Sequence, residues 1–314
     1  MDRPVPNSVL RLKNVVKTYG DFTAVDGVSL DIPKGSIYGF LGPNGAGKTT
    51  TIRMILEIIK PSSGEISILG HPSALDVRYS IGYLPAEKGL YKKMKVWALI
   101  QYFAMLKGMN KQDAKTQAWT LLERYGLKDF AESKVESLSK GMGQKVQVLS
   151  AVAHDPELVI LDEPFSGLDP VNQLVLEELI QDMSANGQTV IFSTHVMQHA
   201  ERLCDHILLI AKGKKIFDGT IDSARATIPR RVFVETSDNV EPLKTLAGIQ
   251  EVIEDETQAN HWQLRIDEQV NPQDILRTCF EKGISLSRFE FTEPSLHDVF
   301  VHLVGDDARE HEFR

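Results

Sequence analysis

A glycine-rich segment carries the clearest chemical signal in the chain, and it reads Gly42-Pro43-Asn44-Gly45-Ala46-Gly47-Lys48-Thr49. Glycines at this spacing let backbone N–H groups turn inward around a phosphate. We expect Lys48 to reach the β- and γ-phosphate oxygens of a nucleotide, and the Thr49 hydroxyl to face Mg²⁺. The segment from Gly42 to Thr50 is therefore the candidate nucleotide-binding loop. Taken alone, the same residues also fit a glycine turn that caps a helix.

Two carboxylates follow an apolar run further along the chain. Leu158-Val159-Ile160-Leu161 is followed directly by Asp162 and Glu163. Ligands of open α/β sheets sit at the carboxyl ends of the strands, where these carboxylates would lie. We assign Asp162 to the metal and Glu163 to general-base catalysis, in which it polarises a water for attack on the γ-phosphate. Without a phosphate loop nearby, an acidic turn at a strand end would be the simpler interpretation.

A histidine ends the next apolar strand, in Phe192-Ser193-Thr194-His195. The imidazole of His195 would project at the same edge of the sheet as the two carboxylates. We predict that His195 contacts the γ-phosphate and assists hydrolysis. Considered by itself, a histidine at a strand end is more often a solvated or capping residue.

The hydrophobic pattern indicates which elements position these side chains. Residues 28–32 alternate between apolar and polar, and a turn at 33–35 precedes the apolar run 37–41, which predicts a hairpin leading into a buried strand. Apolar residues at helical spacing predict a helix over 48–59, which Pro61 stops. The phosphate loop then lies between a strand and a helix, which is the context that its pattern requires.

The middle of the chain is predicted to combine a helical lobe with a parallel sheet. Residues from about 87 to 152 show helical periodicity. The runs 158–161 and 189–192 are short and apolar throughout, as in parallel strands covered on both faces, and the stretch 171–183 between them is helical. We therefore expect an α/β domain over residues 8–222, with the helical lobe inserted into it.

The pattern changes beyond about residue 228, where strand, helix, two strands, helix and strand are predicted in that order. This order suggests a small ferredoxin-like α+β domain. The elements are expected at 232–235, 241–247, 252–254, 262–266, 272–280 and 287–291, with a last helix at 296–304. The second domain is placed at 228–305, and the charged residues 306–314 are expected to form a disordered tail.

Composition disfavours several classes of protein. The 314 residues are 42% hydrophobic and 25% charged, as in ordinary globular proteins, and their number suggests two domains. The formal net charge is -8, and residues 221–314 hold 19 Asp and Glu against 10 Lys and Arg, which disfavours nucleic acid as a partner. Two separated cysteines, Cys204 and Cys279, argue against disulfides or structural zinc and fit a reducing compartment. The sequence contains no run of about 18 apolar residues, so no membrane span is predicted.

With the loop, the carboxylates and His195 in this order, residues 9–220 resemble the ABC (ATP-binding cassette) ATPases. The stretch Leu138-Ser139-Lys140-Gly141-Met142 is similar to the family's signature sequence, with Lys140 where glycine is commonest. The resemblance implies a RecA-like core, an N-terminal antiparallel β subdomain and an inserted helical lobe. It also implies that Ser139 and Gly141 reach the γ-phosphate of ATP bound to the other subunit of a homodimer. By itself, Ser139 is a good helix cap.

Three further stretches match the family more weakly. Tyr19 lies where an aromatic residue stacks on adenine, although packing at a strand end is the alternative. Ser166-Gly167-Leu168-Asp169 resembles the D-loop that crosses the dimer seam, and it is also a good turn and helix cap. Residues 81–85 resemble the approach to the Q-loop, but Ala86 replaces the expected glutamine. Either Glu87 supplies the metal ligand there or the site works without it.

The end of the chain adds a narrower resemblance. Pro294-Ser295-Leu296-His297-Asp298-Val299-Phe300, closing an acidic α+β domain, resembles the ATP-binding subunits of ABC-2-type exporters, including sodium-efflux and drug-resistance groups. This implies an ATP-hydrolysing homodimer on the cytoplasmic face of the cell membrane, driving a separate integral membrane permease, with ATP and Mg²⁺ as cofactors. The alternative is a soluble ABC ATPase that is not coupled to transport. The single cassette, the lack of a heptad run and the acidic tail count against it.

Overall fold

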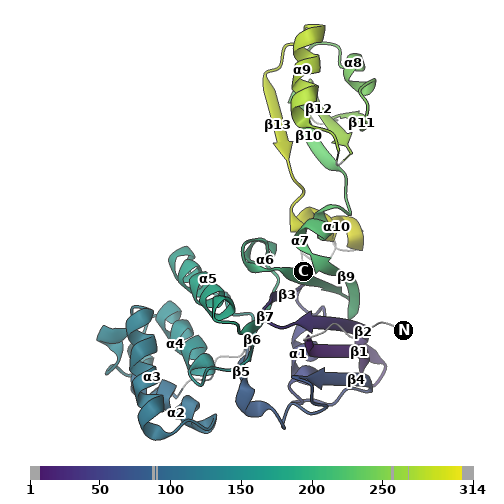
Figure 1. Ribbon diagram of the computed structural model, residues 1–314. Coiled ribbons are helices and arrows are strands. Elements are labelled where there is room, and N and C mark those ends of the chain that lie inside the picture. The colour runs from purple at the N-terminus through teal and green to yellow at the C-terminus, as the bar shows by residue number, and fades with distance from the viewer. Residues whose placement is uncertain (1–7, 87–88, 90, 256–257, 268, 306–314) are drawn as a thin grey trace. The chain divides into compact units, whose positions relative to one another are not determined.

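The computed structural model describes residues 8–86, 89, 91–255, 258–267 and 269–305 (Figure 1). It divides into two compact units, Met1–Thr220 and Ile221–Arg314. Two of the sequence-based expectations, the metal ligand Glu87 and the disordered tail at 306–314, lie outside the described residues. Among the residues that are described, no helix is long and apolar enough to cross a membrane.

The central sheet of the first unit has six strands in the order β5-β6-β7-β3-β8-β9. Neighbouring strands run parallel, except that β9 is antiparallel to β8. The strands are β3 (Ile37–Leu41), β5 (Ile81–Leu84), β6 (Leu158–Asp162), β7 (Thr189–Thr194), β8 (His206–Ala211) and β9 (Lys214–Thr220). Every residue of β3, β6 and β7 is buried, which explains the short apolar runs in the sequence.

A second, antiparallel sheet has the order β2-β1-β4. Its strands are β1 (Ser8–Tyr19), β2 (Phe22–Pro33) and β4 (Ser63–Ile68). The hairpin before β3 is formed by β1 and β2, with Tyr19 opposite Phe22 at its tip. The turn at 33–35 is not itself a hairpin turn, because it carries the chain from β2 in this sheet to β3 in the central sheet.

The two faces of the central sheet are covered by different elements (Figure 1). Alternate residues of β3 point to opposite faces, so Tyr38 packs with the antiparallel sheet and helix α1 (Lys48–Ile55), whereas Ile37 packs with the helical side. Helix α1 ends at Ile55 rather than at residue 59. The left-handed backbone of Glu57, with φ 56°, breaks the helix before Pro61 is reached.

The helical side of the first unit comprises five helices among the described residues. They are α2 (Val96–Leu106), α3 (Lys111–Arg124), α4 (Lys140–Val152), α5 (Pro170–Ala185) and α6 (Met197–Leu203). Two short 3-10 turns, Lys128–Phe130 and Val135–Ser137, lie between α3 and α4, and a third, Arg78–Ser80, directly precedes β5. Side chains of Asn110, Ser139 and Asp169 cap α3, α4 and α5, because each accepts a hydrogen bond from a backbone N–H of the first turn. The caps explain where these helices begin.

The second unit contains a four-stranded antiparallel sheet in the order β11-β12-β10-β13. Its elements are α7 (Ile221–Arg225), β10 (Arg230–Glu235), α8 (Glu241–Lys244), β11 (Ile249–Glu254), β12 (His261–Ile266), α9 (Pro272–Lys282), β13 (Arg288–Thr292) and α10 (Leu296–Val304). This strand order is the ferredoxin-like arrangement that the order of elements predicted. Helix α8 is shorter than the predicted 241–247. Ser295 and Asp298 form a capping box that starts α10.

Candidate nucleotide site

The loop between β3 and α1 needs glycine at two positions for steric reasons. A Cβ atom at Gly42 would collide with the carbonyl oxygen of Ile210, and one at Gly47 would lie 2.6 Å from that of Ala24. Gly47 also precedes α1 in a left-handed conformation, with φ 106°, which favours glycine. The loop therefore lies directly against neighbouring backbone. It presents the N-terminal N–H groups of α1, where a phosphate is stabilised.

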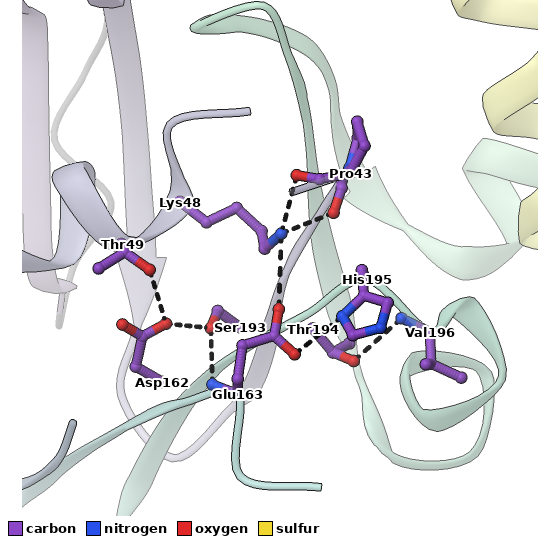
Figure 2. A network of polar contacts seen from close by, with 10 residues as sticks. Pro43, Lys48, Thr49, Asp162, Glu163, Ser193, Thr194, His195 and Val196 are labelled. Carbon is purple, nitrogen blue, oxygen red and sulfur yellow. Dashed lines mark hydrogen bonds and ion pairs between the residues drawn. The ribbon is translucent and has the colours of Figure 1, made fainter. Parts of the chain in front are cut away.

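The ammonium group of Lys48 lies at the centre of the site (Figure 2). The residue is only 5% exposed, and Nζ donates hydrogen bonds to the carbonyl oxygens of Gly42 at 2.6 Å and Pro43 at 3.1 Å. Nζ also forms an ion pair with Glu163 Oε1 at 3.6 Å, which is beyond hydrogen-bond distance. Burial lowers the pKa of Lys48, while the charge of Glu163 opposes that shift. An arriving phosphate would supply stronger acceptors than the two carbonyls.

Asp162 and Thr49 form the oxygen-rich side of the site (Figure 2). Asp162 is 1% exposed, and its Oδ1 accepts hydrogen bonds from Thr49 Oγ1 at 3.2 Å and Ser193 Oγ at 2.5 Å. Its other oxygen, Oδ2, is buried with no hydrogen-bond partner among the described residues. An unsatisfied buried carboxylate oxygen beside a hydroxyl fits a hard cation such as Mg²⁺, which prefers oxygen ligands.

Glu163 occupies an unusual position immediately after β6. Its backbone has φ 49°, a conformation that costs energy for any residue with a side chain. The Glu163 N–H donates to Ser193 Oγ at 2.9 Å, and the Oε2 atom lies 3.0 Å from Nδ1 of His195. Glu163 Oε1 is buried without a hydrogen-bond partner among the described residues. The carboxylate is thus held between the lysine and the imidazole, as Figure 2 shows.

The signature stretch lies at the start of α4. Ser139 is the cap of α4, and its Oγ accepts a hydrogen bond from the N–H of Met142 at 3.2 Å. Gly141 is buried against Asn172 of α5, and a Cβ atom would collide with that amide. The side chain of Lys140 crosses Gly167, in the stretch that resembles the D-loop. Within a single chain, Ser139 therefore acts as the N-cap of α4.

The aromatic candidate Tyr19 lies at the tip of the β1–β2 hairpin. Its ring is 51% exposed, and Lys17 Nζ stands over it at 4.9 Å from the centroid. A ring this exposed does not belong to the hydrophobic core. Ala86, which replaces the expected glutamine, is also exposed.

Ser193 is a site residue that the sequence reasoning did not single out. Its hydroxyl bridges the Asp162 carboxylate and the Glu163 N–H, so one side chain orients both acidic candidates. The available signal was a buried hydroxyl at the end of β7, two residues before His195. Such a residue also fits a satisfied core serine, and only the adjacency of β6 and β7 reveals its role.

Comparison with known proteins gives the family. The model of the ABC transporter family matches residues 25–166, and the model of the "ATP-binding protein DrrA1-3-like, C-terminal domain" matches residues 219–304. The chain is 43% identical over 298 residues to YhaQ of Bacillus subtilis, an ABC transporter ATP-binding protein, with 95% of this chain and 99% of that protein covered. The chain belongs to the ABC transporter ATP-binding proteins.

Two further relatives of this ABC ATPase bear on its activity. Nod factor export ATP-binding protein I of Cupriavidus metallidurans is 33% identical, covering 96% of this chain and 99% of that protein. A dimeric ATP-binding cassette, MJ0796 bound to ADP and Pi after hydrolysis, superposes with a TM-score of 0.62 at 25% identity, covering 68% of this chain and 98% of that one. The protein is an ABC ATPase that binds and hydrolyses ATP, as the ATP-binding subunit of an ABC transporter.

Proposed function

We propose that two copies of this ABC ATPase sandwich two ATP molecules and power export through a separate membrane permease of the ABC-2 type. The observation that carries the proposal is the convergence of three side chains on Glu163. Lys48 and His195 flank its carboxylate, and the Ser193 hydroxyl joins its N–H to the carboxylate of Asp162. Export is supported by similarity to a relative whose name states Nod factor export. The dimer would lie on the cytoplasmic face of the cell membrane, where it meets the permease.

The hydrolytic step follows from the chemistry of the cluster. Lys48 exchanges the loop carbonyls for β- and γ-phosphate oxygens, and the loop from Gly42 to Thr50 binds the phosphates through backbone N–H groups. Glu163 accepts a proton from water as the new O–P bond forms and the bond between the β and γ groups breaks, giving ADP and phosphate. His195 holds the Glu163 carboxylate in place and contacts the γ-phosphate.

Thr49 and Asp162 are the residues that would hold Mg²⁺, because a hydroxyl and a carboxylate oxygen are its preferred protein ligands. When bound, the ion neutralises charge that develops on the phosphate oxygens. Glu87 remains a candidate further ligand in place of the missing glutamine. Tyr19 is proposed to stack on adenine, because its ring is exposed rather than packed.

The second half of each ATP site is proposed to come from the partner subunit. Ser139 and Gly141 lie at the N-terminus of α4, where backbone N–H groups stabilise an anion. In a head-to-tail dimer, this end of the helix would meet the γ-phosphate on the other copy. Hydrolysis then cleaves off the γ-phosphate that both subunits contact, and the dimer separates.

Affinity purification tests the coupling to a permease. Tagged Glu163→Gln protein, which should bind ATP without turnover, is recovered from detergent-solubilised native membranes in Mg-ATP, with Lys48→Ala protein as the control. We expect Glu163→Gln to recover an integral membrane protein in stoichiometric amount, and Lys48→Ala to lose any ATP-dependent part of that recovery. Recovery of Glu163→Gln only in the soluble fraction, alone or with ribosomes, would leave an ATPase that does not drive transport.

A further inference from the structure

A buried glutamine connects the signature helix to the segment that carries Glu163. Gln144 lies on α4, is 3% exposed, and donates a hydrogen bond from Nε2 to the carbonyl oxygen of Pro164 at 2.9 Å. A carbonyl oxygen only accepts, so the amide nitrogen of Gln144 must face it. The other amide atom, Oε1, has no hydrogen-bond partner among the described residues. Such burial costs energy, which suggests that the bond to Pro164 serves a purpose besides stability.

Pro164 follows Glu163 directly in the turn after β6. Glu163 adopts its left-handed backbone directly before Pro164, and its own carbonyl oxygen accepts from the N–H of Ser166 at 3.2 Å in a turn. On the far side of the turn, the ring of Phe165 stacks on His199, with 4.1 Å between centroids. The strained Glu163 is therefore held by its neighbours, and Gln144 supplies the hydrogen bond from α4.

We propose that Gln144 is a positioning residue for ATP hydrolysis, which couples the position of α4 to the orientation of the Glu163 carboxylate in the same chain. This inference rests on the proposed function, in which Ser139 meets ATP on the partner and Glu163 is the base. Gln144 lies five positions after Ser139, which corresponds to a rise of about 7.5 Å along α4. Movement of the helix N-terminus upon docking is then transmitted to Pro164 through the Gln144 amide.

The chain offers a closely matched control. Gln188 is also buried, and its Nε2 donates to the carbonyl oxygen of another proline, Pro156, at 2.8 Å and to Asp155 Oδ1 at 3.2 Å. Pro156 precedes β6, whereas Pro164 follows it, so the two glutamines hold opposite ends of the same strand. Replacing either glutamine by methionine removes a hydrogen bond to a proline carbonyl at similar side-chain length. Gln188→Met also removes the bond to Asp155, so it perturbs the fold at least as much as Gln144→Met.

The first experiment compares steady-state ATP hydrolysis and thermal stability in Gln144→Met and Gln188→Met. For Gln144→Met we expect kcat to fall about 10- to 100-fold, because small misplacement of a catalytic group has effects of that size. The KM for ATP should change less than about twofold, since the phosphate loop is untouched. Gln188→Met should lose at least as much thermal stability and retain kcat. Equal kcat in wild type and Gln144→Met would overturn the inference.

A double-mutant cycle separates positioning from general loss of structure. If Gln144 acts through Glu163, then Gln144→Met has no further effect on the residual turnover of Glu163→Gln protein. A structural role would lower turnover by the same factor in both backgrounds. The cycle also separates the two hypotheses, because normal turnover in Glu163→Gln alone refutes the base assignment, whereas inactive Glu163→Gln with a fully active Gln144→Met refutes only the role of Gln144.

If Gln144→Met does not fold, the isosteric Gln144→Glu variant provides the test. An ionised carboxylate cannot donate to the Pro164 carbonyl, but a protonated one can, and burial raises the pKa of a glutamic acid. The kcat of Gln144→Glu relative to wild type should therefore rise as the pH falls. A ratio that stays constant across the pH range would contradict the inference.

Discussion

At the scale of single residues, two buried carboxylate oxygens mark where chemistry is expected. Asp162 Oδ2 and Glu163 Oε1 have no hydrogen-bond partner among the described residues, although each carboxylate is held firmly through its other oxygen. Buried polar atoms are almost always satisfied, so unsatisfied ones need an explanation. Both oxygens are near the phosphate loop, and a bound nucleotide with its metal would supply the missing partners.

Lys48 offers the most direct test at this scale. Lys48→Ala removes the ammonium group that we expect to contact the β- and γ-phosphates, and a charged hydrogen bond contributes about 1.5–3 kcal/mol. ATP affinity, measured by calorimetric titration, should fall at least about tenfold. Lys34→Ala is the control, because Lys34 is exposed and pairs with Glu157 on the surface. Unchanged affinity in Lys48→Ala would contradict the assignment of the loop.

At the scale of elements, the site depends on close docking of α4 against the central sheet. Gly82 of β5 permits this docking, because a Cβ atom there would lie 2.5 Å from the carbonyl oxygen of Ala151 at the end of α4. Backbone atoms cannot move aside as side chains do. The absence of a side chain at Gly82 therefore allows α4 to lie this close to β5.

Two glycine-to-alanine substitutions should have opposite effects on stability. Gly82→Ala forces β5 away from α4 and should lower the free energy of unfolding by about 1–3 kcal/mol. Gly143→Ala, inside α4 where a Cβ atom would meet nothing within 4 Å, should raise it by about 0.5–1 kcal/mol. Urea unfolding measures both changes. A Gly82→Ala protein as stable as wild type would show that α4 docks less closely than described.

At the scale of the whole molecule, each of the two units has its own hydrophobic core. The core of the second unit consists of residues from 232 to 284, and the described candidate nucleotide-binding side chains lie in Met1–Thr220. The acidic composition beyond residue 220 belongs to this second unit. Nucleotide binding should therefore tolerate damage to the second core.

Leu264→Ala tests that separation. Leu264 is fully buried in β12, so the substitution should lower the stability of the second unit by about 2–5 kcal/mol. Scanning calorimetry should show one weakened transition, while ATP affinity stays unchanged. Leu161→Ala is the counterpart in the first unit, because Leu161 is fully buried beside Asp162, and this variant should weaken ATP binding. A loss of ATP affinity in Leu264→Ala would show that the second unit supports the site.

Local sequence was sufficient to predict the nature of the elements around the site. The apolar runs at 37–41, 158–161 and 189–192 are strands, because strands covered on both faces require apolar side chains throughout. The glycine spacing before Lys48 predicted a phosphate loop because only glycine fits so close to other backbone. The order of elements beyond residue 228 likewise predicted the ferredoxin-like sheet.

Tertiary structure alone decided which distant residues meet. Strand order places β6 beside β7 and β7 beside β3, and this order brings Glu163, His195 and Lys48 together. Ser193 and Gln144 had no signal of their own, because a buried hydroxyl or amide takes its role from the partner it finds across the fold. The pairing of β2 with β1 rather than with β3 was decided in the same way. A strand's periodicity specifies which face is buried, whereas its neighbours are selected by long-range packing.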